Sequence, residues 1–242
     1  MSKKFAIIGN LFAKNFESYY CEVGKNGEPL ILGISVENIF AIMRPITNSK
    51  NTISMYTQAD AKSELNIIVT NRTKRQVSHN RIPLNDLSEK TKDLKDVLQN
   101  YTCVFTYPSI FFQQTIKTLR VDEFEYVEFK VYDGRLELTC ISDSVKRGLS
   151  TFISTDQDLD NEVADESPLK FENELDSSNV YQGIFNLKQI LSFTKCTPLC
   201  NYVKIKLGND APLCIEYDVS GLGTITLCLD PYVMNVDDEE SD

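Results

Sequence analysis

ISVENIFAIMR at residues 34–44 and FNLKQILSFTK at residues 185–195 are two copies of one pattern. In register, apolar positions coincide, and each copy ends on a basic residue, Arg44 in the first and Lys195 in the second. Each copy is followed by two strand-like segments, at 53–56 and 65–69 in the first half and at 203–206 and 213–217 in the second. A helix-strand-strand unit that occurs twice predicts a repetitive architecture.

The length and composition are those of a globular protein. A chain of 242 residues with 42% hydrophobic residues could form one large domain or two smaller ones, and the repeat favours two. No apolar run approaches the roughly 20 residues of a membrane span, and the N-terminus lacks the apolar stretch of a secretory signal. We therefore expect a soluble, intracellular protein that is not bound to a membrane.

The net charge of -10 argues at first against a nucleic-acid partner. The acidic residues are clustered, however, with six between residues 156 and 166 and five more in residues 237–242. Without these two runs, the remainder has 24 acidic and 25 basic residues, so it is close to neutral. A local basic face is compatible with this distribution.

The pattern of cysteines and the single histidine do not favour a catalytic site or a metal site. The seven cysteines are an odd number, and Cys103, Cys140, Cys214 and Cys228 lie at or beside apolar strand positions, which favours reduced, packed thiols. Cys196 and Cys200 lack the second pair or nearby histidine of a zinc site. The sequence has a single histidine, and none lies near a cysteine. We expect no enzyme, no cofactor and no metal.

The element pattern predicts an α+β fold of antiparallel sheets with helices on one face. Val36, Ile39, Phe40 and Met43 have the spacing of one apolar helix face, and a second helix should begin at 108–109. Alternating segments around residues 133–134 (Asp-Gly) predict a hairpin. Other expected strands are 5–12, 19–23, 30–33, 52–57, 65–70, 76–84, 101–107, 149–155, 169–174, 181–185, 202–207, 213–219 and 224–229.

Several short segments resemble a known family. FTKCTPL at 193–199, APL at 211–213 followed by Glu216-Tyr217, and LDP at 229–231 before an acidic tail are similar to the closing third of proliferating cell nuclear antigen, the eukaryotic-type sliding DNA clamp. The resemblance implies clamp domain 1 at 1–84, a connecting linker at 85–100, clamp domain 2 at 101–232 and an acidic tail at 233–242. Met1 aligns inside the family's first domain, so domain 1 is expected to lack its first strand and helix.

The family resemblance also implies a function. Sliding clamps are rings, here expected as a homotrimer, that encircle double-stranded DNA without reading its sequence and act as DNA polymerase processivity factors. They recruit replication and repair enzymes, are opened by a clamp loader and have no catalytic site. The implied location is the nucleus, or a cytoplasmic viral replication site if the chain is viral.

A protein that slides on DNA must bind phosphates weakly, which calls for lysine and arginine on helix surfaces. Such residues lie on or just after three expected helices, and we predict that they face DNA: Arg44, Lys117, Arg120, Lys188 and Lys195. Lys117, Lys188 and Lys195 match basic channel positions of the family, Arg44 matches through the repeat, and Arg120 by helical position. The alternative is that these are ordinary solvated bases.

The resemblance implies an apolar groove that captures short peptides of polymerases and other enzymes. The expected lining residues come from the linker and the C-terminal segment: Leu94, Val97, Leu98, Tyr101, Ala211, Pro212 and Pro231. Alternatively, the spacing of the apolar linker residues fits a short amphipathic helix packed on the core.

The implied subunit joint is a pairing of strand edges, 77–84 of one subunit with 148–153 of the next. The predicted interface residues are Val77, His79, Arg81, Leu149, Thr151 and Ile153. Pro83 cannot donate to a strand ladder, so it should lie at the strand end or face outward.

Two other functions compete with the clamp. A clamp-fold adaptor that does not encircle DNA, and acts in transcription or assembly, is favoured by the expected absence of the first helix. An enzyme using a cysteine nucleophile or paired carboxylates has little support from the sequence. The basic helix ends favour the clamp.

Overall fold

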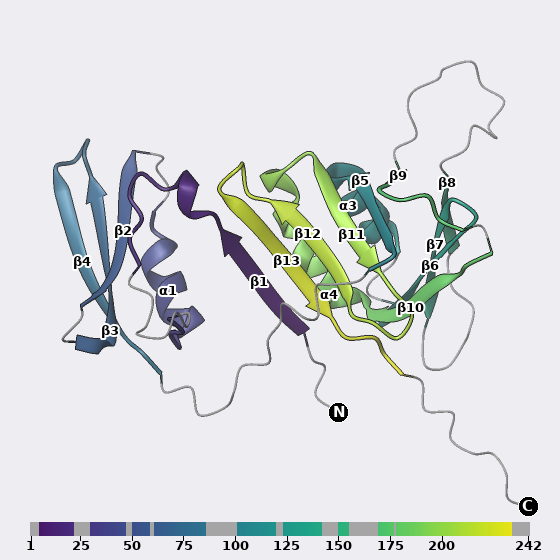
Figure 1. The fold of residues 1–242 in the computed structure, drawn as a ribbon, viewed down its shortest axis with the longest axis horizontal. Coiled ribbons are helices and arrows are strands. Elements are labelled where there is room, and N and C mark those ends of the chain that lie inside the picture. The colour runs from purple at the N-terminus through teal and green to yellow at the C-terminus, as the bar shows by residue number, and fades with distance from the viewer. Residues whose placement is uncertain are drawn as a thin grey trace, which may run out of the picture. The chain divides into compact units, whose positions relative to one another are not determined.

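The computed structural model contains two compact units. The large unit comprises Met1–Tyr19 and Lys95–Asp242, and the small unit comprises Tyr20–Leu94 (Figure 1). The structure describes residues 5–21, 30–46, 50–58, 61–85, 101–119, 123–141, 150–154, 169–176 and 178–233. The sequence-based prediction of antiparallel sheets with a few helices is confirmed.

A six-stranded antiparallel sheet with the order β1-β13-β12-β11-β5-β9 forms one layer of the large unit. Its strands are Phe5–Leu11 (β1), Cys103–Pro108 (β5), Lys170–Phe171 (β9), Tyr202–Leu207 (β11), Leu213–Asp218 (β12) and Gly223–Leu229 (β13). Successive side chains of a strand point to opposite faces, and Leu213, Ile215 and Tyr217 of β12 are all buried in the core. The sheet therefore has an inner, apolar face and an outer face.

The second sheet of the large unit has the order β10-β6-β7-β8. Its strands are Tyr126–Tyr132 (β6), Arg135–Ile141 (β7), Ser150–Ser154 (β8) and Tyr181–Asn186 (β10). Asp133 and Gly134 connect β6 to β7 with positive φ angles of 47° and 66°, as a two-residue hairpin of the mirror-image type requires. The predicted hairpin at this position is confirmed.

Two α-helices and a 3-10 helix pack against the inner faces of these sheets. They are Ser109–Thr118 (α3), Leu187–Phe193 (α4) and Thr194–Leu199 (η2). Helix α3 contacts β5 and β11, whereas α4 contacts β6 and β10. Phe112 and Ile116 of α3 and Leu187 and Ile190 of α4 are buried in the common core. The opposite side of each helix is left for solvent or a partner.

The first strand differs from its expected assignment. Residues 5–12 were expected in a first domain, but β1 is hydrogen-bonded to β13 of the large unit, and a 3-10 helix, Ala13–Asn15 (η1), follows it. Gly223 allows this pairing, because a Cβ atom there would collide with the backbone carbonyl of Asn10. Neither the pairing nor this close approach could be inferred from periodicity alone.

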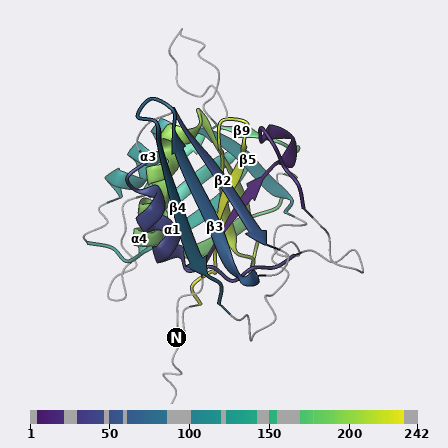
Figure 2. The same cartoon turned by 90° about the vertical axis from the view of Figure 1, so that its left-hand side faces the viewer.

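The small unit is an antiparallel sheet, β2-β3-β4, with one helix on it (Figure 2). Its elements are Val36–Met43 (α1), Asn51–Gln58 (β2), Ala61–Asn71 (β3) and Gln76–Pro83 (β4). Leu65, Ile67 and Ile82 form a small core, against which Ile39 and Met43 of α1 pack. Of the strands expected at 19–23 and 30–33, the described parts are not strands, apart from a bridge between Gly33 and Asn85.

Equivalent capping residues begin the two repeated helices. Ser35 and Asn186 occupy the same position of the repeat, and each side chain accepts a hydrogen bond from the backbone amide three residues later. The distances are 3.4 Å from Asn38 N to Ser35 Oγ and 3.1 Å from Gln189 N to Asn186 Oδ1. Side-chain oxygens satisfy amides that a helix start leaves without partners. The structure thus reproduces the repeat in its local chemistry.

The expected apolar face of α1 is only half correct. Ile39 and Met43 face the small core, but Val36 and Phe40 are 79% and 61% exposed. Leu187, the counterpart of Val36 in the repeat, is completely buried in the large unit, where α3 packs beside α4. Within the described part of the small unit, no second helix covers α1.

Candidate nucleic-acid interface and partner surfaces

Three of the predicted lysines lie on the helix layer of the large unit. Lys117 is in the last turn of α3, Lys188 is in the first turn of α4, and Lys195 is in η2. All three side chains are exposed, while their neighbours Ile116 and Leu187 are buried. The amphipathic helices therefore present these lysines away from the core.

Hydrogen bonds between helices fix this layer. The Gln113 side chain of α3 donates from Nε2 to the Thr194 carbonyl oxygen at 2.9 Å, which ties α3 to the end of α4. Thr197 of η2 donates to the same carbonyl at 2.6 Å, and Ser109 N donates to the Asn201 carbonyl at 2.8 Å. Because α3, α4 and η2 are joined in this way, Lys117 and Lys195 lie on one rigid surface.

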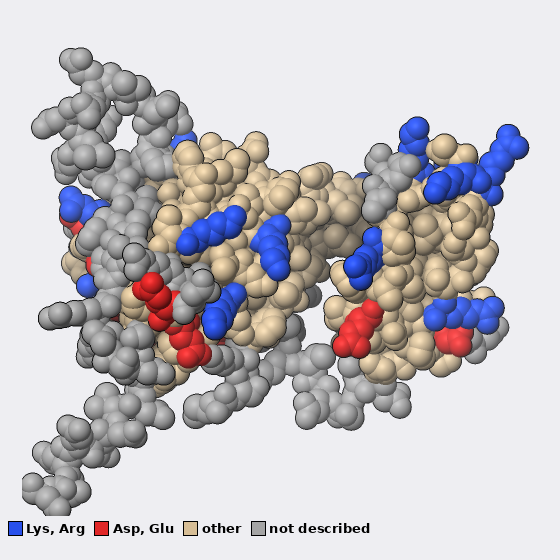
Figure 3. Space-filling model, turned by 180° about the vertical axis from the view of Figure 1, so that it is seen from behind, with Lys and Arg blue, Asp and Glu red and all other residues tan. Residues whose placement is uncertain are grey.

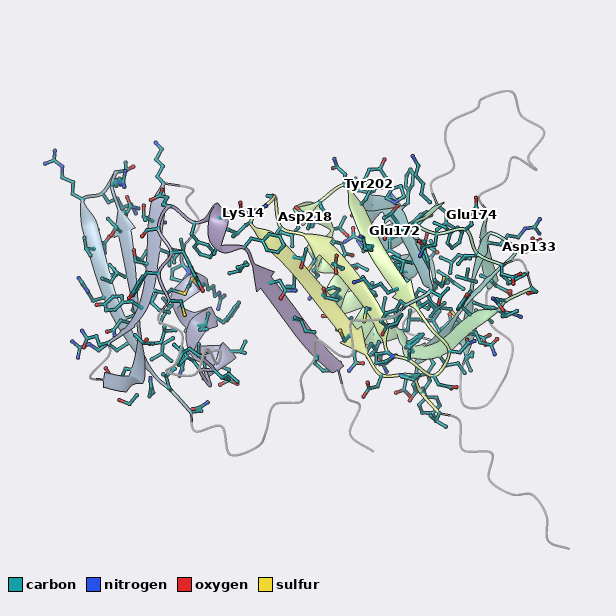
Figure 4. All side chains as sticks on the ribbon, in the orientation of Figure 1. Lys14, Asp133, Glu172, Glu174, Tyr202 and Asp218 are labelled. Atoms are coloured by element: carbon teal, nitrogen blue, oxygen red, sulfur yellow. The ribbon has the colours of Figure 1, made fainter. Side chains whose placement is uncertain are left out.

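Charge is arranged differently on the two sides of the large unit. On the outer sheet face, Lys204 Nζ lies 2.7 Å from Glu172 Oε1, and Lys206 Nζ lies 3.2 Å from Glu216 Oε2. Glu172 is labelled in Figure 4. Within the described residues, Lys117, Lys188 and Lys195 form no ion pair. Figure 3 shows separate basic side chains on the largely uncharged helix side. These lysines are available to an anionic partner.

The other two predicted DNA-binding residues, Arg44 and Arg120, do not lie on the described helix layer of the large unit. Arg44 is exposed at the C-terminal cap of α1 in the small unit, where a cation complements the helix dipole. Arg120 lies outside the described residues.

The predicted peptide groove is described only on its C-terminal side. Tyr101, Ala211, Pro212 and Pro231 are all partly buried, and Tyr101 Oη donates to the Pro212 carbonyl at 2.7 Å. Burial of the Tyr101 ring raises the pKa of its hydroxyl, so it remains a hydrogen-bond donor at neutral pH. The expected linker residues Leu94, Val97 and Leu98 lie outside the described residues.

The segment after β13 is held in place beside the second sheet. Tyr232 stacks on Tyr126 with ring centroids 4.1 Å apart, and its backbone amide donates to the Ile184 carbonyl at 2.7 Å. These contacts fix the position of Pro231, which precedes Tyr232. The C-terminal wall of the predicted groove is therefore preformed.

The two strands expected at the subunit joint, β4 and β8, both lie at a sheet edge among the described residues. β4 pairs only with β3, and β8 pairs only with β7. Val77, His79 and Arg81 are exposed on β4, and His79 and Arg81 line a shallow polar hollow on the sheet. Pro83 is the last residue of β4, where its missing amide donor is tolerated.

The other half of the predicted joint is described through its backbone. Thr151 and Ile153 belong to the edge strand β8, and Leu149 lies outside the described residues. Ile110 and Phe111, two exposed apolar residues in the first turn of α3, were not among the predicted interface residues. The run of three apolar residues at 110–112 was the available signal, because only Phe112 turns toward the core.

Neither a cluster of metal ligands nor a membrane-spanning helix occurs among the described residues. No three His, Cys, Asp or Glu side chains among the described residues come together as a metal site, and the acidic run at 156–166 lies outside them. None of the described helices is long and apolar enough to span a membrane.

Comparison with known proteins identifies the family. The family model described as proliferating cell nuclear antigen, C-terminal domain, matches residues 95–232, which is more than half of the chain. The chain therefore belongs to the proliferating cell nuclear antigen family, and the resemblance drawn from the sequence is confirmed.

Individual relatives match most of the chain at low identity. A probable DNA polymerase sliding clamp of Acanthamoeba polyphaga mimivirus is 26% identical over 91% of this chain, which spans only 43% of that protein. The proliferating cell nuclear antigen of Chaetomium thermophilum is 24% identical over 92% of this chain and 79% of its own length. That of Dictyostelium discoideum is 23% identical over 93% of this chain and 81% of its own length.

Proposed function

We propose that this protein is a sliding DNA clamp that acts as a processivity factor for a DNA polymerase. The family assignment supports this function, and relatives are named DNA polymerase sliding clamps. The observation that carries it is the contrast between the two faces of the large unit. On the sheet face Lys204 and Lys206 are paired with carboxylates, whereas Lys117, Lys188 and Lys195 are exposed on the helix face without ion pairs among the described residues.

This arrangement suits binding without sequence recognition. Reading bases requires side chains aligned in a groove, whereas single ammonium groups on separate helices meet phosphates as point charges. Such contacts are weak individually and equivalent along the duplex, so the protein can move along DNA. Together with the acidic net charge, they favour a protein that is held on DNA by its shape rather than by affinity.

The proposed assembly is a homotrimeric ring closed by strand pairing. β4 of one subunit would pair with β8 of the next, which satisfies both open edges by a head-to-tail contact. The exposed Ile110 and Phe111 add apolar surface that such a contact can cover. A clamp loader would open the ring at this joint.

Partner enzymes would bind at the groove formed by Tyr101, Ala211, Pro212 and Pro231 together with the linker residues Leu94, Val97 and Leu98. An apolar groove with a preformed wall fits a peptide that carries aromatic and aliphatic anchors. The protein would act in the nucleus or at a viral replication site, since relatives include both eukaryotic and viral proteins. The names of the relatives and the family membership do not favour the alternative, a clamp-fold adaptor that does not encircle DNA.

A test of the function measures topological binding. The purified chain is expected to have a solution mass near three times 27.5 kDa by light scattering. On linear duplex DNA, a preformed ring threads over open ends, so blocking both ends with a bulky protein should remove binding while blocking one end should not. A stable monomer whose DNA binding ignores end-blocking would contradict the clamp and favour the adaptor.

A further inference from the structure

Cys214 and Cys228 face each other across strands β12 and β13. They are direct partners in the strand register, and their sulfur atoms lie 3.5 Å apart. Both thiols are buried, with exposures of 0% and 4%, and the structure has them reduced. A disulfide requires about 2.05 Å between sulfurs and paired backbones roughly 4.4 to 6.8 Å apart, a spacing that directly opposed antiparallel residues satisfy.

The pair lies on the outer face of the sheet. Leu213 and Ile215, the neighbours of Cys214 in β12, are in the core, so Cys214 points the other way. On the outer face it is opposite Lys206 of β11, and the Tyr101 hydroxyl lies 3.4 Å from its sulfur. Tyr101 thus covers a thiol pair that would otherwise face solvent.

The surroundings of Cys214 favour its thiolate. The hydrogen bond shared with Cys228 lowers the pKa of Cys214, and the Tyr101 hydroxyl and the Lys206 ammonium act in the same direction against the effect of burial. The same shared hydrogen bond, together with burial, raises the pKa of Cys228. For comparison, burial raises the pKa of Cys140 to about 11. A thiolate beside a thiol is the arrangement in which one cysteine attacks an oxidant and the other resolves the product.

We propose that Cys214 and Cys228 form an oxidation site at which a peroxide links the two strands by a disulfide bond. The Cys214 thiolate attacks one peroxide oxygen, the O–O bond breaks, and water leaves after protonation, giving a sulfenic acid on Cys214. The Cys228 sulfur then attacks the Cys214 sulfur, the S–O bond breaks, and a second water leaves. The two thiols lose two electrons in total, which reduce one peroxide to two waters. A dithiol reductant reverses the link.

The Tyr101 side chain controls access to the two thiols. Its hydroxyl donates to the Pro212 carbonyl at 2.7 Å and lies 3.4 Å from the Cys214 sulfur, so displacement of this side chain uncovers Cys214. The site is independent of the proposed clamp function, since it needs neither DNA nor ring closure.

Peptide mapping of the intact chain tests the proposal. The chain is treated with hydrogen peroxide at a dose that oxidises the exposed Cys21, remaining thiols are alkylated after unfolding, and the protein is digested. No lysine or arginine follows Lys206, so trypsin leaves both cysteines on one peptide, and further cleavage after Glu216 separates them. The expected result is a pair of peptides joined through Cys214 and Cys228 that separates on reduction.

Single substitutions distinguish the two thiols. Cys228→Ser should lose the link and accumulate a sulfenic acid on Cys214 that dimedone traps, whereas Cys214→Ser should lose the link and leave Cys228 unmodified. Cys196→Ser, a control in η2, should keep the link. The proposal is overturned if both thiols of the wild-type chain remain alkylatable at that dose. It is also overturned if the sulfenic acid forms on Cys228 instead, or if Cys196→Ser loses the link.

Discussion

Removing the charges of Lys117, Lys188 and Lys195 should weaken DNA binding in a way that depends on salt. Each lysine that neutralises one phosphate contributes a slope of about -0.9 to the plot of log affinity against log salt concentration for duplex DNA. All three side chains are exposed and without ion pairs among the described residues. Replacing them with alanine should therefore make the slope shallower by about 2.7 for each chain that contacts DNA.

This slope difference can be measured directly. A fourfold rise in salt should weaken the wild-type protein about forty-fold more than the triple variant, which follows from the slope of about 2.7. Fluorescence anisotropy of a labelled duplex at several salt concentrations gives both slopes. The difference between the two slopes should not depend on the sequence of the duplex, because phosphate contacts carry no sequence information.

A matched control removes three lysines from the sheet faces instead. Lys130→Ala, Lys204→Ala and Lys206→Ala together change the net charge by the same amount, but Lys204 and Lys206 are already paired with carboxylates. Their loss should leave the slope near that of the wild type. Equal slopes for the wild type and the helix-face variant, or a larger change in the control, would refute the assignment of the helix layer to DNA.

Three further outcomes are expected. Leu187→Ala should lower the free energy of unfolding by about 2 to 5 kcal/mol, because it leaves a cavity in the core. Val36→Ala, at the equivalent exposed position, should change this free energy by less than about 0.5 kcal/mol. Denaturant titration of both variants measures the difference. Phe111→Glu should shift the mass in light scattering from trimer toward monomer, with circular dichroism unchanged; an unaltered trimer would exclude this residue from the joint. Leu94→Glu with Val97→Glu should abolish binding of a polymerase-tail peptide in calorimetry, and undiminished binding would remove the groove.

Elements whose structure depends only on neighbouring residues in the sequence were predicted well. The apolar spacing over residues 36–43 and Pro45 after them predicted the boundaries of α1, Val36–Met43. The hairpin at 133–134 was equally clear, because an Asp-Gly pair tolerates positive φ at both positions. Periodicity also separated Lys117 and Lys188 from the buried faces of their helices.

Features that depend on distant partners were missed or only half predicted. Nothing in residues 5–11 specifies that they pair with β13, and the apolar spacing of Val36 and Phe40 did not reveal that no described helix covers them. The opposition of Cys214 and Cys228 was within reach, because both are equally far from Gly221, the turn between β12 and β13. The hairpin register alone would have placed them together.

The pairing of β1 with β13 has a consequence for biosynthesis. Residues 5–11 leave the ribosome before their partner at 223–229, which is made more than 200 residues later. At a translation rate of about 5 to 20 residues per second, roughly 10 to 40 s pass between the synthesis of β1 and that of β13. During that interval its apolar side chains and open amides are accessible to chaperones or to other nascent chains, so this sheet can be completed only after residues 223–229 have been made.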